Sequence, residues 1–439
     1  MPLHGTPLQP RLVLTGTAMI AATLVLALTQ ATLGSPVFYA AAATMTIAYA
    51  TMLWWAWNKP PDRRLLTAAF IIALACRAPL VVGPIGRDSD TMRYLWDGRV
   101  QRLGYNPYAV VPADPALAHT HTDDTREMPS RRVHTPYLPA AQLFFRAVVT
   151  LYESAHFMRV VLVACDVATI FVLFRWFMST GQNPWRVLAY AWNPLVILEV
   201  AHSGHIDALG AFWITVSAYC LSRRRTTLAS LAFVLAVTTK LLPIVLAPLY
   251  WRRIRVVDAL LGAAFFVALY APFVYGVDGL QLPLGAVPNV VAAIRFNGPA
   301  FRAIRLATSP TFAASVAVVA GLSAAAWARW RLPVSEPAAW AWPMATSLAF
   351  APVVYPWYLL YFTPFLVSAA ALPLATWTVT VLTAYLVWYI ESWRRPWVVP
   401  SGVLVVEYGA VILATVLMWH WRRPGTAVEP PVTNGRASV

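Results

Sequence analysis

Apolar runs of about 20 residues, the length that an α-helix needs to cross a bilayer, follow one another along most of this sequence. Short segments that carry most of the charged residues separate these runs. Hydrophobic residues make up 59% of the 439 positions and charged residues only 12%, which is far too apolar for a water-soluble domain. We therefore predict an all-α, polytopic integral membrane protein with roughly 12 to 14 transmembrane or re-entrant helices.

The formal net charge is +15, and all but two of the cationic side chains are arginines. The arginines form short clusters between apolar runs, such as RRR at 223–225 and RRIR at 252–255. This is the bias of cytoplasmic loops in membrane proteins and not a continuous basic face, so no nucleic-acid partner is expected. The three cysteines lie inside apolar runs, where a thiol acts as a small hydrophobic group, and they predict no disulfide framework.

The positions of the arginine clusters predict how the chain is threaded through the membrane. The run 12–33 has the length of a span and lacks a small-x-small cleavage site, so we predict a first span rather than a signal peptide. A second span ends at the basic loop 58–64, which is predicted to be cytoplasmic. The run 65–85 then leads to the outer side. Continued to the end, this alternation places both termini in the cytoplasm.

The longest polar interruption, residues 86–142, is thereby predicted to lie outside. Asp88 and Asp90 follow directly on the apolar run 65–85, so both acids should lie at the outer surface of the membrane. Ionisable groups at a hydrocarbon boundary are costly and are usually paired or used, which indicates a functional site facing a water-filled cleft. Residues 91–104 place apolar side chains at helical spacing, and this pattern predicts an amphipathic helix along the membrane interface.

The apolar run 227–251 has arginine clusters at both ends, so both ends should be cytoplasmic and one straight span is excluded. Lys240 and Pro243 lie in the middle of this run. We predict two short helices of about 12 residues, hinged near Lys240, in a re-entrant element that a membrane protein tolerates only beside a cavity. The sequence shows no internal repeat strong enough to suggest an inverted-repeat transporter.

Several motifs of the outer segment resemble the first outer loop of the C-type (GT-C) glycosyltransferases, polytopic membrane enzymes that use polyprenyl-phosphate sugar donors. These motifs are the acid pair with Arg93 and Tyr94, then WDG at 96–98, GYNPY at 104–108 and TPYLPAAQ at 135–142. His205 and Asp207 after a span, and TKLLPIVLAP around Lys240, are similar to the bacterial mannosyltransferase-like branch. The resemblance covers most of residues 65–305, and PWYLLY at 356–361 is a weakly similar stretch in the last third.

The resemblance implies one GT-C-like transmembrane domain at 1–424, with a catalytic outer loop at 86–155. The alternation of spans predicts a second outer loop at 275–305, and the polar composition of 425–439 predicts a disordered cytoplasmic tail. It implies a multi-pass plasma-membrane enzyme that moves one sugar, with mannose expected, from a polyprenyl-phosphate donor to a lipid- or glycan-linked hydroxyl of the cell envelope. The transfer would be inverting, on the extracytoplasmic side, among membrane lipids and without a cofactor. The alternative is a transporter or flippase of lipid-linked sugars, although the polar residues gather on one face.

The resemblance assigns the general base to an acid of the outer loop, and the Asp-x-x-Arg-Tyr spacing favours Asp90 over Asp88. Both acids could instead only cap the interfacial helix or pair with Arg87 and Arg93. Cations are needed at the leaving phosphate. The candidates are Lys240, which could also merely snorkel to a surface, and Arg302, Arg305 and Arg159. The predicted sugar and acceptor contacts are Arg93, Tyr94, Tyr105, Tyr137, His205 and Asp207.

Two groups of His and Asp side chains have the donor types of a divalent metal site. They are His202, His205 and Asp207 at one outer turn, and His119, His121, Asp123 and Asp124 in the polar loop. Nothing in the sequence places the two groups together, so we expect acceptor hydrogen bonding or ordinary polarity there rather than a metal. Nothing resembles a phosphate-binding loop, and a nucleotide-sugar donor is not expected.

Overall fold

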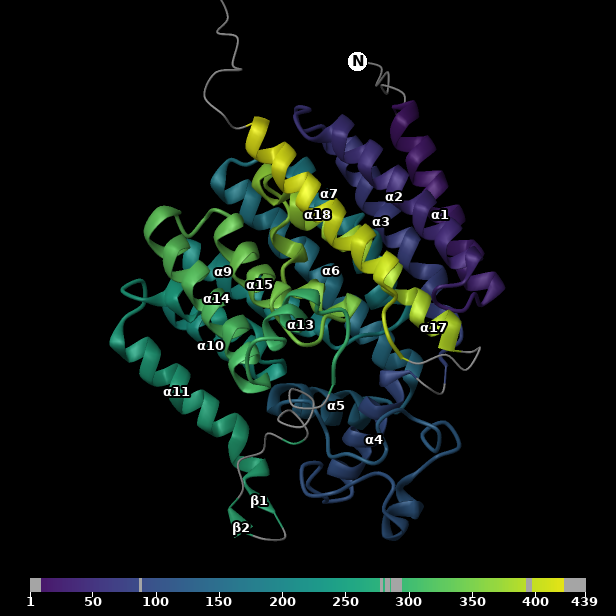
Figure 1. Ribbon diagram of the computed structural model, residues 1–439, viewed down its shortest axis with the longest axis vertical. Helices are drawn as coiled ribbons and strands as arrows, with labels where there is room; N and C mark the ends of the chain where they lie inside the picture. Colours follow the sequence, from purple (N-terminus) through teal and green to yellow (C-terminus); the bar gives the residue numbers. More distant parts are fainter. Residues whose placement is uncertain are drawn as a thin grey trace, which may run out of the picture.

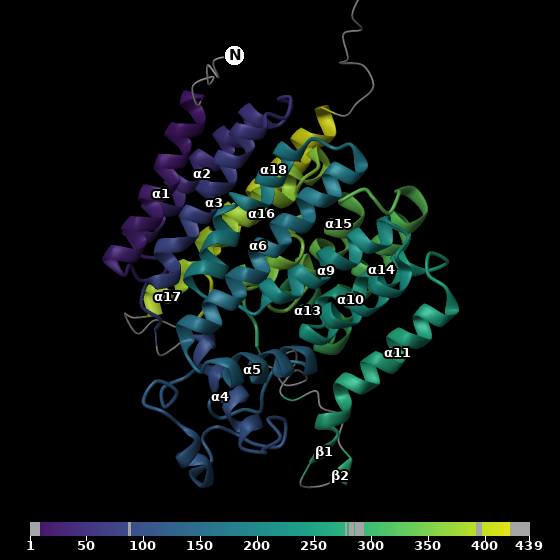
Figure 2. The same ribbon diagram turned by 180° about the vertical axis from the view of Figure 1, so that it is seen from behind.

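The structure is a computed structural model that describes residues 9–86, 89–276, 279–280, 285, 294–391 and 397–421. The candidate acid Asp88, most of the second outer loop and the predicted tail 425–439 lie outside the described residues. Figures 1 and 2 show a bundle of helices with a smaller lobe below it, built around α4 (Asp90–Arg102) and α5 (Pro139–Leu151).

The two described ends of the chain lie on the same side of the molecule. The first turn of α1 (Pro10–Thr29) and the last turn of α18 (Ser401–Trp421) are at the end of the bundle opposite the lobe (Figure 1). This arrangement agrees with the predicted threading, in which an even number of crossings separates the termini and the loop 86–142 is on the other side.

Eight helical segments of the described residues are long and apolar enough to cross a membrane. They are α1, α2 (Pro36–Ala56), α3 (Arg63–Val82), α6 (Ala155–Thr180), α11 (Val256–Tyr270) with the 3₁₀ turn η5 (Ala271–Phe273), α14 (Pro310–Arg331), the segment Ala369–Ile390, and α18. Large apolar side chains on them are exposed, for example Leu28, Trp54 and Val256, as lipid-facing positions require. The prediction of an all-α polytopic membrane protein is confirmed.

The other elements are shorter. They are η1 (Pro115–Thr120), α9 (Asp207–Ser222), α10 (Thr226–Thr239), η4 (Leu242–Tyr250), α13 (Pro299–Arg305), α15 (Ala338–Ala349), η6 (Pro356–Tyr361), η7 (Thr363–Phe365), η8 (Ala369–Ala371), α16 (Leu372–Thr380), η9 (Val381–Tyr385), α17 (Leu386–Glu391), and the two-residue strands β1 (Tyr275–Gly276) and β2 (Gly279–Leu280). The predicted 12 to 14 segments therefore include several helices that are shorter than a full span.

One predicted continuous span, 185–200, is instead broken. It consists of η2 (Pro184–Val187), α7 (Leu188–Ala191), α8 (Pro194–Val196) and the π-helix η3 (Ile197–His202). The break occurs because the Asn193 side chain accepts the N–H of Leu195, while Pro194 has no N–H to continue a helix. Nearly all of this segment is buried by protein, which irregular backbone at membrane depth requires. The run 357–372 is likewise a series of 3₁₀ turns rather than one helix.

The predicted hinge near Lys240 is confirmed. α10 ends at Thr239, Lys240 is extended with φ −158° and ψ 144°, and the 3₁₀ helix η4 starts at Leu242. Pro243 near the start of η4 needs no backbone donor there, so it stops α10 without leaving a bond unmade. The second short helix is 3₁₀ rather than α, and Lys240 lies in the extended link between the two helices.

The predicted helix at 91–104 exists as α4, but it is not an interfacial amphipathic helix. Every residue from Thr91 to Gly98 is buried, including Arg93 and Asp97. The charged faces, which the sequence predicted to be exposed to water, are covered by the loop between α4 and α5. This loop supplies hydrogen-bond partners for Arg93 and Asp97. The pattern of apolar spacing predicts the helix correctly, but it carries no information about what covers the polar faces.

Candidate active site

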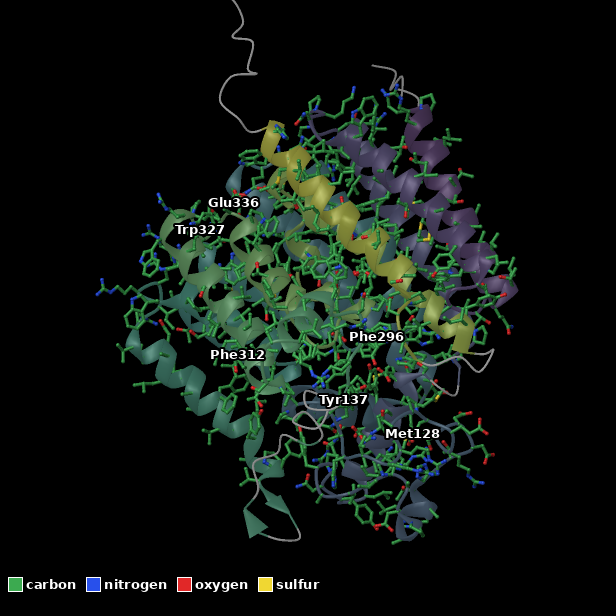
Figure 3. All side chains as sticks on the ribbon, viewed as in Figure 1. Met128, Tyr137, Phe296, Phe312, Trp327 and Glu336 are labelled. Carbon is green, nitrogen blue, oxygen red and sulfur yellow. The ribbon has the colours of Figure 1, made fainter. Side chains whose placement is uncertain are left out.

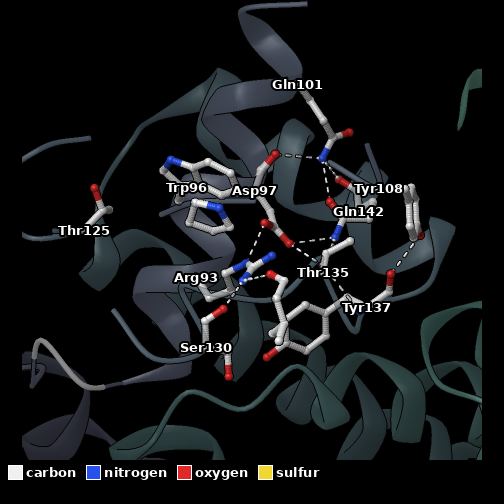
Figure 4. Close-up of polar contacts among 12 residues, drawn as sticks. Arg93, Trp96, Asp97, Gln101, Tyr108, Thr125, Ser130, Thr135, Tyr137 and Gln142 are labelled. Atoms are coloured by element: carbon white, nitrogen blue, oxygen red, sulfur yellow. Dashed lines mark hydrogen bonds and ion pairs between the residues drawn. The ribbon is translucent and has the colours of Figure 1, made fainter. Parts of the chain in front are cut away.

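A buried polar network joins α4 to the loop that covers it (Figure 4). Arg93 Nε donates to Asp97 Oδ1 at 2.8 Å, and Arg93 Nη1 donates to the carbonyl oxygens of Ser130 and Val133. Thr135 Oγ1 and the Gln142 amide donate to Asp97 Oδ2 at 2.6 and 2.8 Å. Because a buried carboxylate is stable only when such donors satisfy it, this network holds the lobe in one shape.

The WDG motif is part of the same framework. Trp96 Nε1 donates to Thr120 Oγ1 at 2.9 Å. A Cβ at Gly98 would lie 2.7 Å from the Phe145 carbonyl oxygen, so only glycine lets α4 approach α5 this closely. The structure therefore places Arg93, a predicted sugar contact, in the scaffold of the lobe.

Asp90 is the first residue of α4, at the top of the lobe. The Ser89 hydroxyl accepts the N–H of Thr91, and a carboxylate in the first turn is favoured by the positive end of the helix dipole. Asp90 is half-buried, and no described residue donates a side-chain hydrogen bond to it. Burial, followed by the nearby charge of Asp90, raises the pKa of both Tyr94 and Tyr137 well above the ordinary value.

Tyr94 and Tyr137 form an aromatic floor beside Asp90. Their ring centroids are 5.0 Å apart in an edge-to-face arrangement, and Tyr94 stacks on Phe145 at 4.5 Å. The Tyr94 hydroxyl accepts the N–H of Ile206 at 3.3 Å, which ties the lobe to the turn before α9. Figure 3 shows Tyr137 and Phe296 between the bundle above and the lobe below.

Three residues of the matching motifs, Lys240, Asp207 and His205, lie near one another around the start of α9. Lys240 Nζ donates to Asp207 Oδ1 at 2.7 Å and lies 3.9 Å from the centroid of the Tyr358 ring. Asp207 is 1% exposed and Lys240 is 27% exposed, so the ammonium group turns inward to a buried carboxylate. His205, two residues before Asp207, is within electrostatic range of both Asp207 and Asp90.

Glu199 is a site residue that the sequence analysis missed. It is fully buried in the π-helix η3, its Oε2 lies 2.8 Å from His205 Nδ1, and its Oε1 accepts the Tyr385 hydroxyl at 2.5 Å. π-Helices are rare and are often found at functional sites. The available signal was a lone acid inside an apolar run, which is a functional candidate by default.

The last third of the chain provides an aromatic wall that the motifs did not predict. Trp357 stacks on His205 with centroids 4.1 Å apart, and Tyr355 stacks on Trp357 at 4.5 Å. Tyr358 lies under Lys240, and Asp90 is within electrostatic range of Tyr355 and Tyr358. The PWYLLY stretch was the only signal for this wall.

Another buried carboxylate, Glu407 of α18, anchors the described segment of the predicted second outer loop. It accepts from the Asn297 amide at 3.1 and 3.0 Å and from Trp377 Nε1 at 2.8 Å. Next to Asn297, Phe296 pairs with Val353 through the backbone and stacks on Tyr355 at 4.7 Å. The described part of this segment therefore reaches the aromatic wall.

The remaining predicted residues are placed differently. Arg159 is buried, and its guanidinium donates to the carbonyl oxygens of Leu80, Val81, Gly83 and Pro84. It thereby satisfies carbonyls at the end of α3, and its two terminal nitrogens are engaged by the chain itself. Arg302 and Arg305 are exposed on α13, close to the segment of Phe296. Tyr105 lies within the lobe, where its hydroxyl is 3.4 Å from His119 Nε2.

The two histidine and aspartate groups lie in separate places. His119 and His121 bond within the lobe, to Ala116 and to Pro112 and Thr125, while His202 and His205 lie at the turn before α9. Within the described residues, no group of three or more His, Cys, Asp or Glu side chains is arranged to hold a metal ion. The expectation of a cofactor-free site stays a prediction.

The structure combines helices of membrane-spanning length with a polar lobe outside them. Acids, a lysine and aromatic rings gather where the two meet, which is the arrangement of a polytopic membrane enzyme. Residues 11–253, more than half of the chain, match the sequence model of the alpha-(1->6)-mannopyranosyltransferase family, N-terminal domain. The chain belongs to this family, so it is a glycosyltransferase that transfers mannose. The search of curated proteins gives no match to the chain.

The matched range determines which parts of the site belong to the family domain. It includes Asp90, Glu199, His205, Asp207 and Lys240, and it ends three residues after η4. The aromatic wall lies beyond it. The match confirms the resemblance to a membrane mannosyltransferase, and it leaves the role of each residue to be argued from the geometry.

Proposed function

We propose that this protein transfers one mannose from a polyprenyl-phosphate donor to a lipid- or glycan-linked hydroxyl, with inversion at the anomeric carbon. The observation that carries the proposal is the position of Asp90. It is a half-buried acid with no side-chain donor among the described residues, and it lies where the lobe meets the bundle. In a direct displacement, Asp90 would take the proton of the acceptor hydroxyl as that oxygen attacks the anomeric carbon.

The donor phosphate is assigned to Lys240. Its ammonium group lies at the chain break between α10 and η4, and it is part-exposed although Asp207 pairs with it. A cation in a membrane protein needs an anionic partner, and a phosphate that arrives beside Asp207 would share the three N–H donors of this lysine. Arg302 and Arg305 are further donor candidates, because they are exposed on α13 beside the segment that reaches the aromatic wall.

The sugar and acceptor are assigned to the surfaces on either side of Asp90. Tyr94 and Tyr137 form the floor, and His205 with Trp357 forms one wall. Flat rings of this kind can pack against the apolar face of a sugar, while the imidazole and hydroxyl groups bond its edge. Asp88, which lies outside the described residues, remains a second candidate base.

The active site is assigned to the extracytoplasmic side of the plasma membrane. The lobe lies opposite the two described chain ends, and the arginine clusters favour cytoplasmic ends. A cysteine at Asp123, an exposed position of the lobe, tests this assignment, because Cys76 and Cys220 are buried and Cys165 is half-buried. Labelling of intact cells by an impermeant maleimide is expected, with the parent protein as control. Labelling only after the membrane is opened would contradict the outer location.

The reaction itself is tested with purified protein in lipid nanodiscs. Polyprenyl-phosphate mannose with a radiolabelled sugar is expected to yield labelled lipid or glycan, and UDP- and GDP-mannose serve as control donors. The product's anomeric configuration, read by glycosidase digestion, tests inversion. No product with the polyprenyl donor, together with movement of that donor between leaflets of proteoliposomes, would favour a flippase.

A further inference from the structure

Glu199 has no part in the reaction as proposed, although its position is costly. Its side chain is fully buried. Oε1 accepts the hydroxyl of Tyr385, which is 186 residues away in sequence, and Oε2 lies 2.8 Å from Nδ1 of His205. Burying a carboxylate is unfavourable unless it is paired and hydrogen-bonded. Asp97 and Glu407 are buried acids that tie segments of the fold together, whereas one partner of Glu199 is His205, a residue of the candidate site.

The pair fixes the orientation of the His205 ring. Glu199 occupies Nδ1, so Nε2 is the ring nitrogen left for another partner. Trp357 stacks on the ring with planes only 14° apart, and the backbone N–H of His205 donates to the Glu199 carbonyl oxygen at 3.0 Å. With the plane, one nitrogen and the backbone all held, the ring has no freedom to turn away from the site.

The charges around His205 alternate in sign. Glu199 of η3, Asp90 of α4 and Asp207 of α9 lie close enough to affect the charge of His205, and so does His202 of its own turn. Lys240 pairs with Asp207, and Arg159 lies near His202. Glu199, His205 and Asp90 therefore form a sequence of negative, positive and negative groups when the imidazole is protonated.

The two histidines of this turn differ in protonation. Burial lowers the pKa of His205, but the bond to Glu199 and the charges of Glu199, Asp90 and Asp207 outweigh burial and raise it. Burial, Arg159 and His205 lower the pKa of His202 to about 4. His205 is thus the histidine of this turn that becomes cationic first as the pH falls.

We propose that Glu199 is a positioning residue that holds the His205 ring with Nδ1 toward Glu199 and Nε2 toward the site of Asp90, where the charge of the imidazolium would stabilise the carboxylate that acts as the base. This inference rests on the proposed role of Asp90. During transfer, the acceptor proton moves to an Asp90 carboxylate oxygen, the new bond forms from the acceptor oxygen to the anomeric carbon, and the bond to the phosphate oxygen breaks. The phosphate keeps that electron pair, and His205 keeps its proton throughout.

The test is the pH profile of kcat/KM for Glu199→Gln. This variant keeps the size and hydrogen bonding of the side chain but removes the charge that favours the imidazolium. Without that charge the imidazolium would be lost at lower pH, so the basic side of the profile is expected to move to lower pH and the profile to narrow from that side. At the optimum the rate should fall about 10- to 100-fold, the range seen when the partner behind a metal-bound histidine is removed.

Glu407→Gln is the matched control, because Glu407 is equally buried but bonds Asn297 and Trp377. It should leave the width of the profile unchanged, whatever it does to yield. Tyr385→Phe keeps the carboxylate and removes one donor to it, so a smaller narrowing is expected. Equal profiles for Glu199→Gln and the parent, with both proteins folded, would overturn the proposal.

A second measurement is independent of turnover. In protein with isotope-labelled histidines, the His205 signal, identified by its loss in His205→Gln, reports the protonation midpoint directly. Glu199→Gln is expected to lower this midpoint, and an unchanged midpoint would overturn the pairing of Glu199 with His205. A parent protein that fails to use the polyprenyl donor, yet shows the lowered midpoint in Glu199→Gln, would contradict the donor assignment and support the pairing.

Discussion

Asp90 and Asp97 lie about two turns apart on α4, yet their surroundings are opposite in kind. Asp97 is fully buried, and its two oxygens accept from Arg93, Thr135 and Gln142. Asp90 is half-buried and receives no side-chain hydrogen bond from the described residues. A carboxylate saturated by protein donors has no capacity left for a substrate, whereas Asp90, at the start of a helix, has no such donor among the described side chains.

This difference shows that a shared motif can combine two roles. The Asp-x-x-Arg-Tyr-x-Trp-Asp-Gly stretch resembles a catalytic loop over its whole length. Its second half builds the lobe through Asp97 and Gly98, and its first residue faces the bundle. The comparison separates activity from stability, and the following variants test that separation.

Asp90→Asn is expected to have the largest effect on activity. The amide keeps the size of the side chain but cannot accept the proton, so kcat should fall by roughly 10²- to 10⁴-fold. Thermal unfolding in detergent, followed by size exclusion, should match that of the parent. A folded Asp90→Asn protein that turns over at the parental rate would contradict the base assignment.

Asp97→Asn should show the converse. Removing one charge leaves the Arg93 guanidinium buried without its counter-ion, a loss of about 3–5 kcal/mol in stability. The measurement is the same unfolding assay, and the fraction that stays folded should retain most of its kcat. A stable Asp97→Asn protein with a kcat as low as that of Asp90→Asn would remove the distinction between the two acids.

Lys240→Met should weaken the donor more than it slows the chemistry. A charged hydrogen bond contributes about 1.5–3 kcal/mol, so the KM for the polyprenyl donor should rise roughly 10- to 100-fold. Initial rates over a range of donor concentrations measure it, and Lys59→Met, at a loop beside Trp55, is the control. An unchanged KM would contradict the donor-phosphate role of Lys240 and leave its pairing with Asp207 as its only role.

Gly98→Ala should have the smallest effect of the four. The added methyl group meets the Phe145 carbonyl oxygen at 2.7 Å, and overpacking of this kind costs about 1–3 kcal/mol. Unfolding temperature measures the loss, and Gly104→Ala, where a Cβ meets nothing within 4 Å although φ is +88°, compares crowding with backbone strain. Equal stability of Gly98→Ala and the parent would show that α4 and α5 can move apart.

The apolar runs and the arginine clusters were sufficient to predict the fold class, and Lys240 with Pro243 was sufficient to predict the hinge. These are local signals, since the length and hydropathy of a run, or a proline within it, determine the structure of that same stretch of chain. The break at Asn193 was missed because the run around it is apolar, although Asn193 followed by Pro194 is itself a local turn signal.

The site could be predicted only in part, for a related reason. Asp90, His205, Asp207 and Lys240 were found through motifs, and the structure brings them close together. Glu199 and the wall of Tyr355, Trp357 and Tyr358 were missed because their meaning depends on contacts between distant parts of the chain. No periodicity in sequence connects Glu199 with Tyr385 or His205 with Trp357.

The contact between Glu199 and Tyr385 also affects when the site can assemble during synthesis. During synthesis the first 253 residues, with Asp90, His205 and Lys240, leave the ribosome well before Tyr385 and Trp357. Until the last helices insert, the nascent protein holds a carboxylate without its hydroxyl donor and an imidazole without its stacking partner. Assembly of the proposed site would therefore wait until Trp357 and Tyr385 are made, and a chain that stops before Trp357 is expected to be inserted in the membrane without activity.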